Sequence, residues 1–185
     1  MTLDRKYKNS FPFKSLSDAG VTDKWTLASG VEYFYNQADL TAKPLNVQEN
    51  GVDMTEGTLG SLAAAEWAWD STNERVQLRL TDDLDPDAKA ADFIKCSIPL
   101  EVFQSSGRTL CGSILLGNTE TAAAKFVIVL TTSLDVVMST WLVDVSVTAS
   151  PWEPPKGILL STSDKFLLMT DKELSNIYIT VEEGV

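Results

Sequence analysis

Short segments in which apolar and polar residues alternate, separated by turn-forming residues, run through most of this 185-residue chain. One such segment is Glu66–Leu80. Its apolar side chains fall at every second position on either side of a polar turn: Trp67, Trp69, Val76, Leu78 and Leu80. Because successive side chains of a strand point to opposite faces, this spacing predicts two paired strands that share one apolar face. A chain built from such pieces is expected to be all-β.

Two tryptophans in so small a hairpin need an explanation. Each aromatic side chain buries about 150–250 Å² and therefore suits a module too small to build a core from Leu and Val alone. We expect these five side chains to form a structural core: Trp67, Trp69, Val76, Leu78 and Leu80. The alternative is an exposed platform on which sugars or bases stack.

Three stretches of the chain differ in character. Residues 1–24 are polar without a sustained period, which predicts an extended N-terminal arm. Residues 25–95 predict a small Trp-braced β module, with a type I′ turn at Asn50-Gly51 and a short helix over 87–95. Residues 96–185 are more apolar and predict a β-sandwich or jelly-roll-like domain.

The strands expected in this last stretch cover residues 95–98, 108–116, 123–131, 135–147, 157–161, 165–169 and 176–182. The last two are expected to pair as a terminal hairpin. Pro151, Pro154 and Pro155 bound a loop that cannot join a central strand.

The charge of the chain is acidic and unevenly placed. Its formal net charge is -11, which argues against direct nucleic-acid binding because phosphates must be neutralised by clustered Lys and Arg. The first fourteen residues are basic instead and also carry aromatic side chains. We therefore predict an interaction arm that reaches a neighbouring subunit, with these residues: Arg5, Lys6, Tyr7, Lys8, Phe11 and Phe13. The alternative is a frayed terminus.

The sequence offers few groups for catalysis or for holding a cofactor. The chain has no histidine, so a Ser-His-Asp or Cys-His arrangement cannot be built. Cys96 and Cys111 lack metal-ligand spacing, and we expect both to be reduced and buried, with a disulfide only if their strands are neighbours. No catalytic residue and no cofactor is expected.

The acidic segment Asp82–Asp87 is the strongest candidate for a metal site. Asp83, Asp85 and Asp87 alternate as at the start of an EF-hand loop. However, Ala88 stands where that loop needs Gly, and Ile94 stands where it needs a bidentate Glu. The alternative is a solvated turn followed by an Asp that caps a helix.

Several motifs in residues 31–89 occur together. An aromatic strand is followed by "NVQENGVDMT", then by "GSLAAAEWAWD" and "RVQLRLTDDLDPD". This combination resembles a small β module of tailed-bacteriophage virion proteins. The C-terminal part, with "SILLGNTETAAAKFVIVL" and "PPKGILLSTSDKFLLMTD", is similar to β-sandwich domains of phage head and neck proteins. The resemblance implies a non-enzymatic structural role and supplies no catalytic residues.

We therefore expect a virion protein assembled in the host cytoplasm. Its expected role is a head-attached decoration (cement) or minor capsid protein. Its expected partners are the major capsid protein or neighbouring virion proteins, with self-association, a trimer being one option, and no membrane, since no apolar run approaches about 20 residues. The first alternative is a head-tail connector or a tail or fibre component. The second is a carbohydrate-binding module with an exposed Trp25, Trp141 or Trp152, and an enzyme would need a pocket with paired carboxylates.

Overall fold

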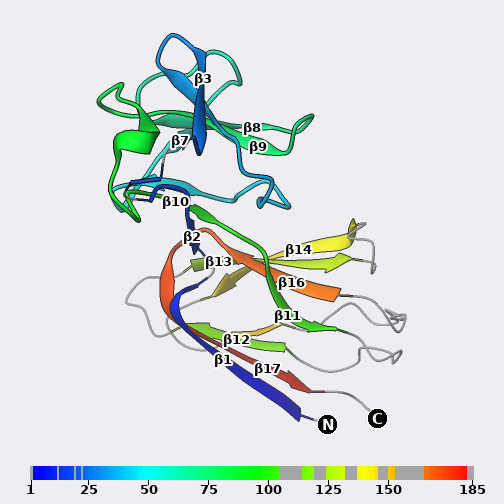
Figure 1. The fold of residues 1–185 in the computed structure, drawn as a ribbon. Helices are drawn as coiled ribbons and strands as arrows, with labels where there is room; N and C mark the ends of the chain where they lie inside the picture. Colours follow the sequence, from blue (N-terminus) through cyan, green and yellow to red (C-terminus); the bar gives the residue numbers. More distant parts are fainter. Residues whose placement is uncertain are drawn as a thin grey trace. The chain divides into compact units, whose positions relative to one another are not determined.

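The computed structural model describes the chain except residues 1, 12, 19, 22, 105–113, 119–123, 132–136, 146–149, 153–164 and 183–185. Its backbone contacts divide it into two compact units, each described by itself below. The terminal unit comprises Met1–Pro12 and Pro99–Val185, and the inserted unit comprises Phe13–Ile98. Both units are built from strands, so the fold is all-β (Figure 1).

In the described part of the terminal unit, the strands form two four-stranded antiparallel sheets. The first has the order β1-β17-β12-β15, formed by Thr2–Phe11, Leu174–Glu182, Ile114–Asn118 and Ser150–Trp152. The second has the order β11-β16-β13-β14, formed by Leu100–Gln104, Lys165–Thr170, Ala124–Thr131 and Val137–Val145. In the first sheet, β1 pairs antiparallel with β17, so strands from opposite ends of the chain are neighbours (Figure 1).

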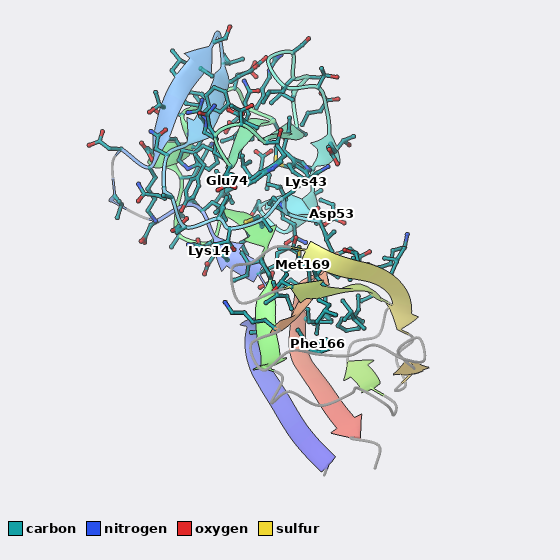
Figure 2. All side chains as sticks on the ribbon, turned by 90° about the vertical axis from the view of Figure 1, so that its right-hand side faces the viewer. Lys14, Lys43, Asp53, Glu74, Phe166 and Met169 are labelled. Atoms are coloured by element: carbon teal, nitrogen blue, oxygen red, sulfur yellow. The ribbon has the colours of Figure 1, made fainter. Side chains whose placement is uncertain are left out.

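The core of the terminal unit follows the period of two along β13 and β16. Ala124, Phe126, Ile128 and Leu130 are buried, whereas the residues between them are half-buried or exposed. Phe166 of β16, labelled in Figure 2, is fully buried beside them in the same sheet. The strand predicted over residues 123–131 is therefore confirmed as β13.

The inserted unit also contains two sheets. The smaller has the order β2-β10-β5-β6, formed by Phe13–Ser15, Ile94–Ser97, Val47–Glu49 and Val52–Asp53. The larger has the order β3-β4-β9-β8-β7, formed by Trp25–Ser29, Glu32–Tyr35, Arg75–Arg79, Glu66–Asp70 and Thr55–Glu56. All pairs are antiparallel except β7 with β8.

One apolar cluster joins the two sheets of the inserted unit. Its buried members are Leu16, Trp25, Tyr35, Leu40, Val47, Met54, Trp67, Val76, Leu78, Leu80, Ile94 and Cys96. Trp25 and Tyr35 are cross-strand partners whose ring centroids lie 5.1 Å apart at 58°, within the range of favourable aromatic pairs. Cys96 is a free thiol, and burial raises its pKa to about 12; Cys111 lies outside the described residues.

The turn predicted at Asn50-Gly51 is confirmed. Asn50 and Gly51 have φ values of 49° and 76°, and Glu49 pairs with Val52 across them. Positive φ at both central residues is the signature of a type I′ turn, whose twist matches that of the strands it joins.

The N-terminal arm predicted over residues 1–24 is not a separate segment. Residues 2–11 form β1, which pairs with β17 of the same chain, and Phe13 is buried in the inserted unit. A polar strand without clear alternation can form here because β1 lies at a sheet edge. The module predicted over 25–95 therefore begins earlier, at Phe13, and ends at Ile98.

Two other predicted elements are wrong. The helix expected over 87–95 is a single 3-10 turn, η1 (Pro86–Ala88), because Asp92 takes a positive φ of 61° and the chain continues into β10. Lys165–Thr170 and Leu174–Glu182 do not form a terminal hairpin, since β16 and β17 belong to different sheets.

Besides β1, two strands of the terminal unit were not predicted. These are β11 and β15, and Pro151 stands in β15, where an edge position tolerates its missing N–H. The expected strand 157–161 lies outside the described residues. No helix in the described part of the chain is long and apolar enough to cross a membrane.

Candidate functional site

The acidic segment after β9 is tied to the protein by ion pairs and backbone bonds. Asp82 pairs with Lys89 and accepts a hydrogen bond from the Leu84 N–H at 3.1 Å. Asp83 accepts two bonds from the Arg79 guanidinium, at 2.7 and 3.2 Å. The Lys89 ammonium lowers the pKa of Asp82, and the Arg79 guanidinium lowers that of Asp83.

The other two acids of this segment, Asp85 and Asp87, accept hydrogen bonds from backbone N–H groups. Asp85 caps η1 by accepting the Asp87 N–H at 2.9 Å. One oxygen of Asp87 accepts the N–H groups of Asp23 at 2.9 Å and Trp25 at 3.4 Å, so it fixes the start of β3.

The candidate metal ligands Asp83, Asp85 and Asp87 are thus directed to three different partners. Among the described residues, no group of three or more Cys, Asp or Glu side chains is placed to hold a metal ion. The EF-hand-like alternation reflects a capped turn, which is the alternative that the sequence left open.

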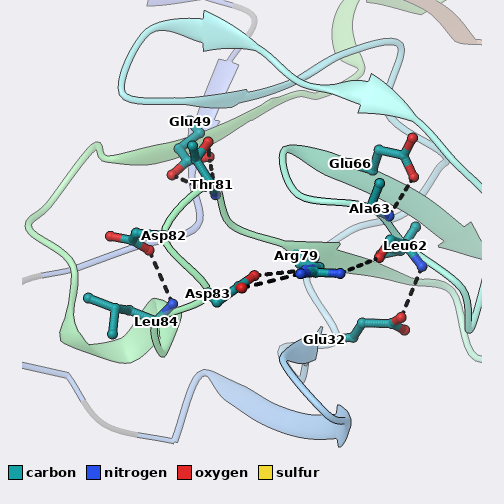
Figure 3. Close-up of polar contacts among 10 residues, drawn as sticks. All are labelled: Glu32, Glu49, Leu62, Ala63, Glu66, Arg79, Thr81, Asp82, Asp83 and Leu84. Atoms are coloured by element: carbon teal, nitrogen blue, oxygen red, sulfur yellow. Dashed lines mark hydrogen bonds and ion pairs between the residues drawn. The ribbon is translucent and has the colours of Figure 1, made fainter.

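A polar network around Arg79 fastens the 57–65 loop to the larger sheet of the inserted unit (Figure 3). Arg79 Nη1 donates to the Leu62 carbonyl at 3.1 Å, and Glu32 accepts the Leu62 N–H at 2.9 Å. The second oxygen of Glu32 accepts from Gln77 Nε2 at 2.7 Å, and Gln77 Oε1 accepts the Gly60 N–H at 2.7 Å. This network lets Gln77 be buried with both ends of its amide bonded.

The tryptophans do not form an exposed platform in the inserted unit. Trp67 is 2% exposed, and Trp69 is half-buried against the same apolar cluster. Trp25 is buried too, and its Nε1 donates to the Leu16 carbonyl at 3.1 Å. Of the tryptophans named for a carbohydrate site, Trp25 is therefore in the core, while the side chains of Trp141 and Trp152 lie outside the described residues.

A hollow of about 260 Å³ opens beside the Asn50-Gly51 turn. Its lining residues are Glu49, Asn50, Val52, Asp53, Met54, Ala65, Thr81 and Phe93. Glu49 accepts from the Thr81 N–H at 3.0 Å and from its hydroxyl at 2.7 Å (Figure 3). Asp53 accepts from the side-chain amides of Asn46 at 2.7 Å and Gln48 at 2.9 Å. Both carboxylates therefore already serve as acceptors for neutral donors of the fold.

The basic and aromatic residues of the predicted arm are divided between the two units. Arg5, Lys6, Tyr7, Lys8 and Phe11 lie in β1, paired in register with β17, and Phe13 packs in the inserted unit. Their pairing is long-range in sequence, so no local pattern identified it.

Comparisons with known proteins supply no site by analogy. No family model, no curated protein and no solved structure matches this chain.

Proposed function

We propose that this chain is a non-enzymatic structural protein of a tailed-phage virion, acting as a head-attached decoration (cement) or minor capsid protein. The observation that supports this proposal most is the structural role of the side chains of β8, the Glu-Trp-Ala-Trp-Asp strand. Trp67 is in the core, Trp69 packs against it, and Asp70 fixes the following turn. The strand that carries the resemblance to virion modules thus serves to brace a small unit.

The polar groups support the same role. The carboxylates of the acidic segment, of Glu32 and of Glu49 are engaged by bonds that hold loops in place. We further propose that the two sheets of the terminal unit face each other as a β-sandwich that docks on the major capsid protein or on neighbouring virion proteins. The acidic charge of the chain suits a position away from packaged nucleic acid.

Quantitative mass spectrometry of purified particles tests the proposal. A decoration protein is present in hundreds of copies because it follows the symmetry of the shell, whereas a connector or tail component is present in about a dozen or fewer. Hundreds of copies support the proposed role, and about a dozen would favour the connector or tail instead. Particles that carry no peptide of this chain would contradict both.

A further inference from the structure

Three of the four sheet edges in the terminal unit carry features that discourage pairing with another strand. The β1 edge is basic, with Arg5, Lys6 and Lys8. The β15 edge contains Pro151, which has no N–H to donate. The β11 edge carries Glu101 and a register shift before Phe103. Charge, proline, short length and bulges are the means by which proteins protect exposed edges.

The fourth edge, β14, has little of this protection. Its nine residues, Val137–Val145, contain no proline and a single charged residue, Asp144. Its register with β13 shifts once near its start, between Val137 and Ser139, and is continuous from Ser139 to Val145. Leu142 on this strand is 64% exposed, and no strand in the described part of the chain pairs with the outer edge of β14.

We infer that β14 pairs antiparallel with β14 of a second copy of this chain across a two-fold axis. The two β11-β16-β13-β14 sheets then become one continuous sheet. This inference rests on the proposed function, since it names the surface through which an assembly protein associates with itself.

The residues of β14 favour a second copy as the occupant. A pairing centred on Leu142 places Leu142 opposite its own symmetry mate, Trp141 opposite Val143, and Asp144 opposite Thr140. Aromatic with β-branched pairs stabilise neighbouring strands, and no like charges meet. The same operation centred on Lys6 of β1 would place two lysines opposite each other. A two-fold contact uses the same edge on both copies, so the assembly closes as a dimer.

Sedimentation equilibrium of the full chain over a concentration series, at physiological ionic strength, tests this inference. We expect a monomer–dimer equilibrium. Leu142→Lys should raise the dimer dissociation constant at least about tenfold, because like charges would then face each other across the two-fold axis. Leu27→Lys is the matched control: Leu27 is 54% exposed on the edge strand β3 of the inserted unit, and its replacement should leave the dimer unchanged.

If Leu142→Lys does not fold, residue-resolved amide hydrogen exchange of the unaltered chain provides a second test of the pairing. Protection of alternate β14 amides should rise with protein concentration, while protection of β1 amides should not. A chain that stays monomeric, a trimer, or a dimer insensitive to Leu142→Lys would overturn the inference. A monomer that is nevertheless abundant in particles would overturn the pairing and leave the proposed function standing.

Discussion

Asp70 shows how a single carboxylate organises a turn. It ends β8, and its Oδ1 accepts the N–H groups of Thr72 at 3.1 Å and Asn73 at 3.2 Å. Its Oδ2 accepts from the Asn73 side chain at 2.8 Å and from Arg75 Nε at 3.1 Å. These bonds, that of the Asn73 side chain foremost, lower the pKa of Asp70 in the folded protein. Asp70 therefore stabilises the fold above its ordinary pKa, and this contribution is lost as the pH falls through the folded value.

We predict that Asp70→Asn lowers the free energy of unfolding by about 1–3 kcal/mol at pH 7, because the N–H donors of the turn lose the charged acceptor that the buried Asp70 supplies. The difference from the unaltered protein should shrink as the pH falls below about 4 and through the lowered folded pKa of Asp70, because the carboxyl is protonated first in the unfolded chain and then in the folded protein. Urea unfolding at pH 7 and pH 3 measures both effects. Glu74→Gln, at an exposed position of the same turn, is the control and should change little. Equal stability of Asp70→Asn and the unaltered chain at pH 7 would show that the turn does not depend on this carboxylate.

At the scale of the strand, the two tryptophans of β8 differ in burial, so they should contribute differently to the free energy of unfolding. Trp67→Ala is expected to cost about 3–5 kcal/mol, the usual range for removing a buried aromatic side chain. Trp69→Ala should cost clearly less, since Trp69 is only half-buried. Denaturant unfolding of the two variants measures the difference. The brace interpretation would be wrong if Trp67→Ala were as stable as the unaltered chain.

The turn between β5 and β6 provides a test of backbone conformation alone. A Cβ at Gly51 would meet no atom within 4 Å, so a substitution there is limited by its φ of +76° and not by space. We expect Gly51→Ala to destabilise the chain by about 1 kcal/mol, because the left-handed region disfavours side chains. Gly51→Asn should lose less, since Asn tolerates this region. Thermal unfolding compares the two variants, and equal losses would argue against a type I′ requirement.

Local signals in the sequence predicted some of the local elements of this fold and failed for the helix over 87–95 and the terminal hairpin. The turn at Asn50-Gly51 and the strand over 123–131 were identified because each depends on residues that are neighbours in the chain. The pairing of β1 with β17 joins opposite ends of the chain, and no property of Thr2–Phe11 specifies its partner. The acidic segment shows the same limit: the spacing of Asp83, Asp85 and Asp87 was visible, whereas the partner of Asp87, the Trp25 N–H, lies 62 residues away and depends on tertiary packing.

At the scale of the whole molecule, the inserted unit begins and ends at residues that are neighbours within its smaller sheet. The chain enters it at Phe13 and leaves it after Ile98. Phe13 of β2 lies opposite Ser97 of β10 in an antiparallel pair, so both connections start from the same end of the smaller sheet. Adjacent ends are what allow one folding unit to be inserted into another without disturbing either.

This arrangement predicts that residues 13–98 fold when expressed alone, because they contain the whole apolar cluster around Trp67. Residues 25–95, the module suggested by sequence alone, should not fold. They lack Leu16, which is fully buried and accepts the Trp25 indole N–H, and Ser97, whose hydroxyl accepts the Leu45 and Asn46 N–H groups. Amide dispersion in NMR spectra and cooperative loss of near-ultraviolet circular dichroism on heating distinguish the two fragments. An unfolded 13–98 fragment would mean that the inserted unit needs the terminal unit for its stability, and a folded 25–95 fragment would mean that β2 and the end of β10 add nothing essential to the core.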